Sequence, residues 1–161
     1  MYLAILSKVK TREEKEKVQE ELQLLLSSLY EDEGRAFDST LNHKVRAWVS
    51  QALTEEISKE AIGRESYLKG LIDSLEKLNE IYLNCAFEPT QDFVDRLGMY
   101  LDQAVGGHVL MNISKDPEII GGVQIIFKGQ YLDFSFKRIF EKEFEESREE
   151  YLKLLKGKQS Q

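Results

Sequence analysis

The chain has 161 residues, of which 42% are apolar and 32% charged, and its formal net charge is −7. This composition fits a folded soluble protein and excludes a wholly disordered chain. The negative balance argues against nucleic acid and anionic lipid as partners held by bulk charge, because both are negative themselves. The single cysteine, Cys85, excludes an intramolecular disulfide.

The sequence predicts neither a membrane-spanning segment nor a targeting peptide. No apolar run in the sequence approaches the roughly 20 residues that a membrane span needs. The apolar start of the chain runs into Lys8, Lys10 and Arg12, which reverses the charge order of a secretory signal peptide, and no Arg-rich transit peptide is present. We therefore expect an intracellular protein whose partners are proteins.

The first half of the chain predicts helices. Thr11 and Glu14 have the spacing of a capping box, and apolar residues recur after them at steps of three and four. The expected helices are a short one before Thr11, one from Thr11 to near Gly34, one from 38 to 52, and one from about 58 to 78 with a break near Gly63.

Near residue 80 the apolar period changes from helical to alternating. Ile81, Leu83, Cys85 and Phe87 are predicted on one side of a strand. A helix over 90–104, three further strands and a last helix capped by Ser135 follow, which gives the order β-α-β-β-β-α. The first two strands are expected to be parallel through a right-handed crossover, and the later ones antiparallel.

This pattern predicts an α+β fold. A helical bundle over 1–79 is followed by a small mixed-sheet domain over 80–161 with a long C-terminal helix. The boundary is placed where the apolar period changes.

No catalytic or metal-binding constellation stands out in the sequence. His43 and His108 are far apart, and with one cysteine they form no ligand cluster of zinc-site spacing. Cys85 is interpreted as a small buried hydrophobe. Gly106-Gly107 and Gly121-Gly122 precede strands and not helices, which argues against phosphate cradles. The first pair predicts a helix stop, and the second predicts a bend or a close backbone approach. We expect no metal and no cofactor.

The last helix carries two apolar patches. Their residues are Phe136, Ile139, Phe140 and Phe144, a face able to cover the sheet, and Tyr151, Leu152, Leu154 and Leu155 beyond them. The helix would extend about 30 Å, so its end either projects as a partner or dimer site or folds back on the N-terminal helices.

One stretch carries a family resemblance. Asp116-Pro-Glu-Ile-Ile-Gly-Gly-Val123, followed by Asp133-Phe-Ser135, resembles the C-terminal domain of the ATP synthase delta subunit, whose mitochondrial counterpart is the oligomycin-sensitivity-conferring protein. Leu83-Asn-Cys-Ala-Phe87 is similar to that family's V-x-S-A-x strand. The resemblance covers roughly residues 80–142. Departures are Cys85 in place of serine, Phe134 in place of a frequent glycine, and a shorter helical part.

The resemblance implies a non-catalytic subunit of the peripheral stalk of F-type ATP synthase and not an enzyme. Such a subunit links the catalytic head to membrane-anchored subunit b and resists rotor torque during proton-driven ATP synthesis. A reduced helical bundle over 1–79 would bind the N-terminal segments of alpha, and 80–161 would bind the C-terminal helices of b. The chain would lie in the cytoplasm, peripheral on the inner face of the plasma membrane through the complex, without inserting into it.

Candidate contact residues follow from this comparison. They are Leu22, Leu25 and Trp48 for alpha, and Ile139, Phe144, Tyr151, Leu152 and Leu155 for b. The motif residues interpreted as structural are Asp116, Pro117, Ile120, Gly121, Gly122, Asp133 and Ser135. Two other interpretations stay open: a stand-alone adaptor with a delta-like C-terminal domain, and a small intracellular enzyme or ligand-binding domain that uses the sheet edge and Gly121-Gly122.

Overall fold

The computed structural model describes residues 2–32, 35–59 and 63–157, and side chains within them except at Lys59, Glu146 and 149–157. By its contacts the chain divides into a helical unit, 1–80 with 91–112, and a sheet unit, 81–90 with 113–161. The described residues form seven helices and a four-stranded mixed sheet. The division that the sequence suggested, 1–79 and 80–161, stays a prediction.

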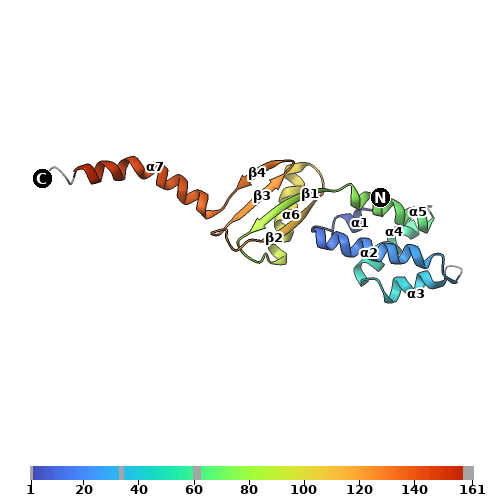
Figure 1. Ribbon diagram of the computed structural model, residues 1–161. Helices are drawn as coiled ribbons and strands as arrows, with labels where there is room; N and C mark the ends of the chain where they lie inside the picture. Colours follow the sequence, from blue (N-terminus) through green and yellow to red (C-terminus); the bar gives the residue numbers. More distant parts are fainter. Residues whose placement is uncertain (1, 33–34, 60–62, 158–161) are drawn as a thin grey trace. The chain divides into compact units, whose positions relative to one another are not determined.

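The helical unit holds six helices among the described residues. They are α1 (Leu3–Leu6), α2 (Arg12–Ser28), α3 (Arg35–His43), α4 (Ala47–Lys59), α5 (Arg64–Glu76) and α6 (Gln91–Val105). Helix α2 contacts α3 and α5, and α1 contacts α4 (Figure 1). Fully buried Leu22, Leu53, Tyr67 and Leu71 lie in their shared core.

Helix α2 begins where the sequence predicts and ends earlier. The Thr11 hydroxyl oxygen accepts a hydrogen bond from the Glu14 backbone N–H at 3.2 Å, which confirms the predicted cap. The helix ends at Ser28, not near Gly34, which lies outside the described residues. The Ser28 hydroxyl donates to the Leu25 carbonyl, and Asp32 then takes a left-handed backbone, φ 48°, so the chain turns away.

A tertiary contact divides the helix that was predicted over 38–52. The chain breaks between α3 and α4, and Arg46 stands immediately before α4. The Glu21 carboxylate of α2 accepts from the Arg46 backbone N–H at 3.0 Å and from its guanidinium at 2.8 and 3.0 Å. The prediction of one helix was therefore wrong, because a residue distant in sequence supplies the cap of α4. The expected break near Gly63 is confirmed, since Gly63 is the N-cap of α5.

The N-terminal segment is held at both ends. The Glu56 carboxylate of α4 accepts from the backbone N–H groups of Tyr2 at 3.1 Å and Ala4 at 2.9 Å, at the start of α1. Further on, the Lys10 carbonyl accepts from the Met111 N–H at 2.8 Å, and Thr11 forms a parallel bridge with Met111. The segment between α1 and α2 thereby lies along the start of β2 (Val109–Lys115).

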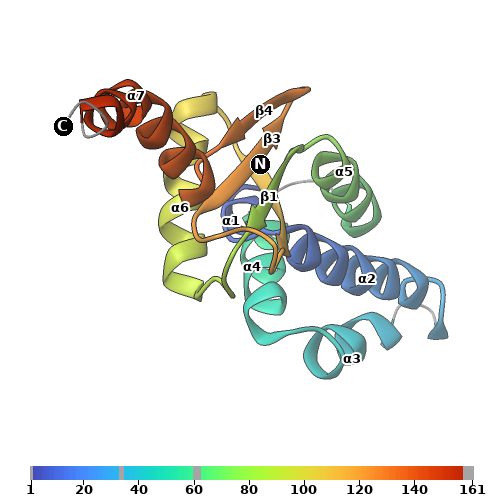
Figure 2. The ribbon, with the colours of Figure 1, turned by 60° about the vertical axis from the view of Figure 1, so that its left-hand side comes forward.

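The sheet has the strand order β2-β1-β3-β4. Strand β1 (Asn79–Cys85) pairs antiparallel with β3 (Val123–Phe127), which pairs antiparallel with β4 (Gln130–Asp133). Lys128 and Gly129 connect β3 to β4 with φ of 49° and 77°, the two positive angles of a type I′ hairpin turn. The chain then enters α7 (Phe136–Gly157), as Figure 2 shows.

The two faces of the sheet differ. Ile81, Leu83 and Cys85 are buried on one face, as their alternation predicts. Phe87 does not continue this row: it is 40% exposed, because β1 ends at Cys85. On the opposite face, Tyr82 pairs with Ile126 and Ile126 with Tyr131 across β1, β3 and β4. These three side chains are exposed, so this face carries an unburied apolar row.

Candidate protein interface

The loop from Asp116 to Gly122 ties the strands to the start of α7. The Asp116 backbone N–H donates to the Cys85 carbonyl at 2.9 Å, and the Asp116 carboxylate accepts from the Glu118 N–H at 2.9 Å. At its other end, the Gly122 carbonyl accepts from the Ala86 N–H at 3.2 Å. The loop therefore satisfies backbone groups at the end of β1.

The double glycine at 121 and 122 is required by a close approach of two chain segments. Both glycines have positive φ, 65° and 86°. A Cβ on Gly121 would lie 2.4 Å from the Phe136 ring, and one on Gly122 would lie 2.2 Å from the Phe134 carbonyl oxygen. The predicted close backbone approach is confirmed, since side chains at either position would collide with the entry into α7.

Asp133 and Ser135 fix that entry. The Asp133 carboxylate accepts from the Ser135 N–H at 2.8 Å and from the Tyr131 hydroxyl at 3.1 Å. Hydrogen bonds from the Ser135 hydroxyl and backbone lower the pKa of Asp133. Burial, followed by the hydrogen bond to Asp133, raises the pKa of Tyr131. Ser135 is only 2% exposed, so the junction between β4 and α7 is well defined.

The first apolar patch of α7 is exposed. Phe136, Ile139, Phe140 and Phe144 are 53%, 52%, 56% and 68% exposed. The expectation that this face covers the sheet was wrong, because α7 leaves the sheet at the end of β4 (Figures 1 and 2). Clustered exposed aromatic residues of this kind mark surfaces that contact another molecule.

A groove lies between the end of β4 and α7. Its volume is about 350 Å³, and its lining residues are Leu132, Asp133, Phe134, Arg138, Ile139 and Lys142. We call it the α7 groove. A polar depression of about 330 Å³ shares Asp133 and Arg138 with it. The lining of the α7 groove combines apolar and charged side chains, and protein interfaces combine the same two kinds.

The structure places the predicted contact residues differently. Ile139 lines the α7 groove, and Phe144 lies on the same exposed patch. Leu22 and Leu25 are 0% exposed, so their assignment as contact residues is corrected: they belong to the core of the helical unit. Trp48 is half-buried, with the Lys8 ammonium 5.4 Å and the Arg46 guanidinium 5.3 Å from its ring centre.

The remaining predicted residues fall into two groups. Tyr151, Leu152 and Leu155 are in the last turns of α7, and their side chains lie outside the described part of the structure. Asp116, Pro117, Gly121, Gly122, Asp133 and Ser135 come together around the loop and the β4–α7 junction. Ile120 contributes only its carbonyl, which accepts from the Phe136 N–H at 3.2 Å, while its side chain is 61% exposed.

Leu132 and Phe134 were missed as surface residues. Leu132 lies in β4 at the edge of the sheet, and Phe134 follows the end of β4 at Asp133. Apolar alternation does not reveal that a strand is at the edge of its sheet. Leu132 and Phe134 are 47% and 57% exposed. The sequence signal for an exposed residue at position 134 was that phenylalanine stands there in place of the glycine that is frequent in the family.

The described residues offer few features that suggest metal binding or a reactive thiol. No group of three His, Cys, Asp or Glu side chains there could hold a metal ion. Cys85 is buried, and burial raises the pKa of its thiol, as suits a packing residue. No helix within the described part is long and apolar enough to cross a membrane.

Comparison with known proteins decides the family. The sequence model of the ATP synthase delta (OSCP) subunit family matches residues 63–143, half of the chain. The chain belongs to the ATP synthase delta (OSCP) subunit family. This confirms the resemblance seen in the loop and the β4–α7 junction. A separate search of the curated proteins finds no match to the chain.

The delta (OSCP) family is a family of non-catalytic ATP synthase subunits in the peripheral stalk, associated with the membrane through the complex. The matched residues run from α5 to the first turns of α7. They include the whole loop, the junction and the α7 groove. Helices α1 to α4 precede the match.

Proposed function

We propose that this chain is the stator connector that links the catalytic head of an F-type ATP synthase to membrane-anchored subunit b. In that position it resists the torque of the rotor during proton-driven ATP synthesis, at the inner face of the plasma membrane. Its membership of the delta (OSCP) family supports a place in that complex. We also propose that the isolated chain does not hydrolyse ATP.

The observation that carries the proposal is the exposed apolar surface of the sheet unit around α7. Ile139, Phe140 and Phe144 are spaced to meet one face of a partner helix, and all are more than half exposed. We infer that the α7 groove and this patch receive the C-terminal helices of b, an apolar helix-in-groove contact. A connector under load needs slow dissociation, which a desolvated aromatic cluster favours.

The contact with alpha is proposed for the helical unit. With Leu22 and Leu25 in the core, Trp48 is the remaining predicted residue that a partner can reach. Two cationic side chains lie over its ring, so a peptide that contacts Trp48 would also meet Lys8 and Arg46. We propose that an N-terminal segment of alpha binds there.

Binding to purified subunits tests the connector. Because Trp48 is the single tryptophan, its fluorescence emission reports directly on a segment that covers it. We expect an alpha N-terminal peptide to shift this emission, and a soluble b fragment to be retained by the immobilised chain. Retention of neither alpha nor b would overturn the connector.

A second candidate is an adaptor that works outside the synthase. It is favoured by one observation: the family match leaves α1 to α4 uncovered. In that case b-type helices would still bind the α7 groove, while alpha would leave the Trp48 emission unchanged. The two titrations therefore separate the adaptor from the connector.

A further inference from the structure

One face of the sheet carries a row of three exposed side chains. Tyr82 on β1 pairs with Ile126 on β3, and Ile126 pairs with Tyr131 on β4. Each of the three is more than a third exposed. We call these residues the sheet-face row. Two aromatic side chains and an aliphatic one that lie together on a surface mark a contact with another molecule.

Tyr131 is already oriented for such a contact. Its hydroxyl donates to the Asp133 carboxylate at 3.1 Å, and the same carboxylate oxygen accepts from the Gln124 side-chain amide at 3.4 Å. The other oxygen of Asp133 accepts from the Ser135 N–H. Asp133 is therefore engaged within the chain and holds the Tyr131 ring. An oriented side chain loses less conformational entropy when a partner covers it.

The polar depression adjoins the sheet-face row, because Tyr131 lines it as well. Gln124 and Asp133 also line the depression, two residues along their strands from the row and on the same face, about 7 Å away. At the opposite end of the row, the Lys128 ammonium lies over the Phe127 ring, 5.1 Å from its centre. The row is thus bordered by the depression on one side only.

The loop side of the depression is negatively charged. Asp116 and Glu118 line it there, while its cations, Lys137 and Arg138, come from α7. Lys137 contacts Glu141 at 4.0 Å. Among the described residues no cation forms an ion pair with Asp116 or Glu118. These two carboxylates therefore form an acidic margin beside the row.

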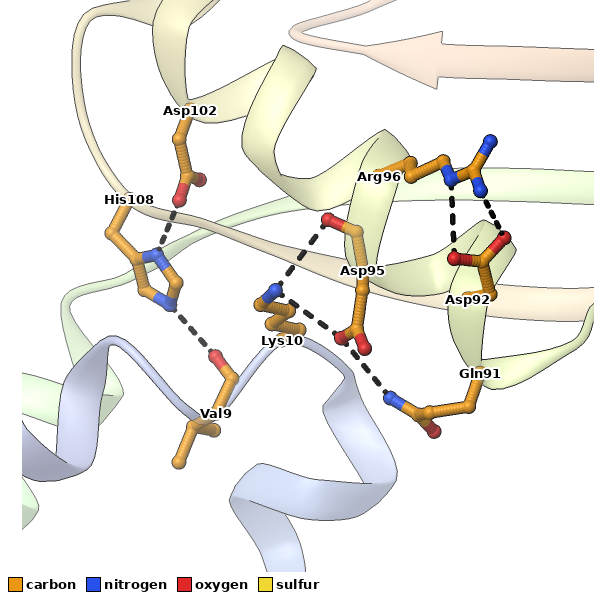
Figure 3. A network of polar contacts seen from close by, with 8 residues as sticks. All are labelled: Val9, Lys10, Gln91, Asp92, Asp95, Arg96, Asp102 and His108. Atoms are coloured by element: carbon orange, nitrogen blue, oxygen red, sulfur yellow. Dashed lines mark hydrogen bonds and ion pairs between the residues drawn. The ribbon is translucent and has the colours of Figure 1, made fainter.

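The polar side chains around α6 offer no comparable opening, because they already contact one another. The contacts, drawn in Figure 3, are Lys10 with Asp95 at 3.2 Å, Arg96 with Asp92 at 3.0 Å, and the His108 ring with Asp102 at 2.9 Å and the Val9 carbonyl at 2.7 Å. A partner would have to replace these contacts, whereas at the acidic margin it would only add to what is there.

We propose that the sheet-face row and the acidic margin bind a basic amphipathic helix of another protein. Side chains of the row are about 4.8 Å apart across the strands, and apolar residues at steps of three and four along a helix are about 5 Å apart. A helix that crosses the strands therefore meets all three. A lysine or arginine on its flank then pairs with Glu118 or Asp116. This inference does not depend on the proposed stator function.

The charge of the margin favours this partner over other molecules that cover apolar sheet faces. Exposed tyrosines on a sheet can stack on the bases of RNA, but Asp116 and Glu118 repel its phosphates. Anionic lipid is repelled for the same reason. A second copy of the chain would bring its own acidic margin to the contact. A basic helix is attracted by the same two carboxylates.

Peptide binding to the full chain tests the surface. The probe is a synthetic helical peptide with leucine at steps of three and four and lysine along one flank, and the control peptide has glutamate in place of each lysine. By nitrogen-labelled NMR we expect the lysine peptide to shift the amide signals of Tyr82, Ile126, Tyr131 and Glu118. It should bind at least about tenfold more tightly than the glutamate peptide at low salt. Equal affinities, or tighter binding of a single-stranded RNA, would overturn the proposal.

Charge reversal at Glu118 tests the acidic margin. Glu118→Lys should weaken the lysine peptide and strengthen the glutamate peptide, an exchange of preference that a partly unfolded chain would not produce. Glu20→Lys is the matched control, because Glu20 is also exposed, lies on α2 and gives the same change in net charge. It should leave the preference unchanged. Equal effects of the two variants would mean that only overall charge acts, and would overturn the assigned margin.

Tyr82→Ser tests the row. The loss of an exposed ring should weaken the lysine peptide about tenfold and leave the melting temperature almost unchanged. Phe144→Asp alters the apolar patch of α7 and should leave this peptide's affinity as it is. If Phe144→Asp abolishes binding of the peptide and Tyr82→Ser does not, the peptide occupies α7 and the sheet-face row is not its site.

Discussion

Gly122 lies against the Phe134 carbonyl oxygen, which a Cβ on Gly122 would approach to 2.2 Å. The backbone of Gly122 also has a φ of 86°, which L-residues rarely adopt. Two constraints therefore act at one position. The positive φ limits which residue can stand at position 122, and the close approach sets the distance between the loop and the start of α7.

Gly122→Ala should destabilise the chain by at least about 3 kcal/mol, because the strained backbone and the collision with backbone atoms act together. Gly129→Ala is the control. Its φ is 77°, but nothing lies within 4 Å of an added Cβ, so about 1 kcal/mol of backbone strain is expected. Urea unfolding measures both. Equal losses would exclude the collision as a cause.

Glu21→Ala should destabilise the helical unit by about 2 kcal/mol. The carboxylate is 13% exposed and accepts from both the backbone and the guanidinium of Arg46. Its removal uncaps α4 and leaves the half-buried Arg46 guanidinium with Glu14 as its carboxylate partner. Glu16→Ala removes an exposed pair with Arg12 and should cost less than about 0.5 kcal/mol. Thermal unfolding of the two variants compares them, and similar losses would argue against the capping role.

Asp133 should make stability depend on acid pH. Hydrogen bonds from Ser135 lower its pKa in the folded chain, so its contribution is complete above the unfolded value of about 3.9 and disappears as pH falls through the lower folded value. Asp133→Asn keeps an acceptor for the Ser135 N–H but has no charge. We expect the wild type to be the more stable of the two at neutral pH and the difference to vanish in acid. Acid unfolding curves that stay parallel would exclude this linkage.

Phe144→Asp should weaken retention of b by more than tenfold with little change in melting temperature. A charge in the centre of an apolar contact removes an aromatic anchor, while an exposed side chain contributes little to folding. Tyr100→Asp is the matched control, because Tyr100 on α6 is as exposed as Phe144, both at 68%. Binding isotherms with a soluble b fragment measure the effect. Unchanged binding by Phe144→Asp would remove the patch from the proposed interface.

Local signals in the sequence specified much of the fold. Thr11 and Glu14 predicted the start of α2, and Gly106 predicted the end of α6. Gly121-Gly122 predicted a bend or a close backbone approach, and the structure has a close approach to the entry into α7 there. These features depend on the backbone preferences of a few neighbouring residues within a single turn or cap. They can therefore be predicted from a single sequence.

The residues of the candidate interface could be predicted less well from such local signals. Apolar periodicity identified Leu22, Leu25, Ile139 and Phe144 by the same rule, yet the first two are fully buried and the last two are exposed. Periodicity states that a helix has an apolar face and does not state whether another part of the same chain covers it.

The sequence by itself determined where most helices and strands form, the turns between them, and the family motif from Asp116 to Ser135. Only the tertiary structure decided that Glu21 divides one predicted helix into two, that α7 leaves its apolar face uncovered, and that His108 meets Val9 and Asp102. The physical reason is range: backbone preferences are settled by adjacent residues, whereas burial and ion pairing depend on which distant segments meet.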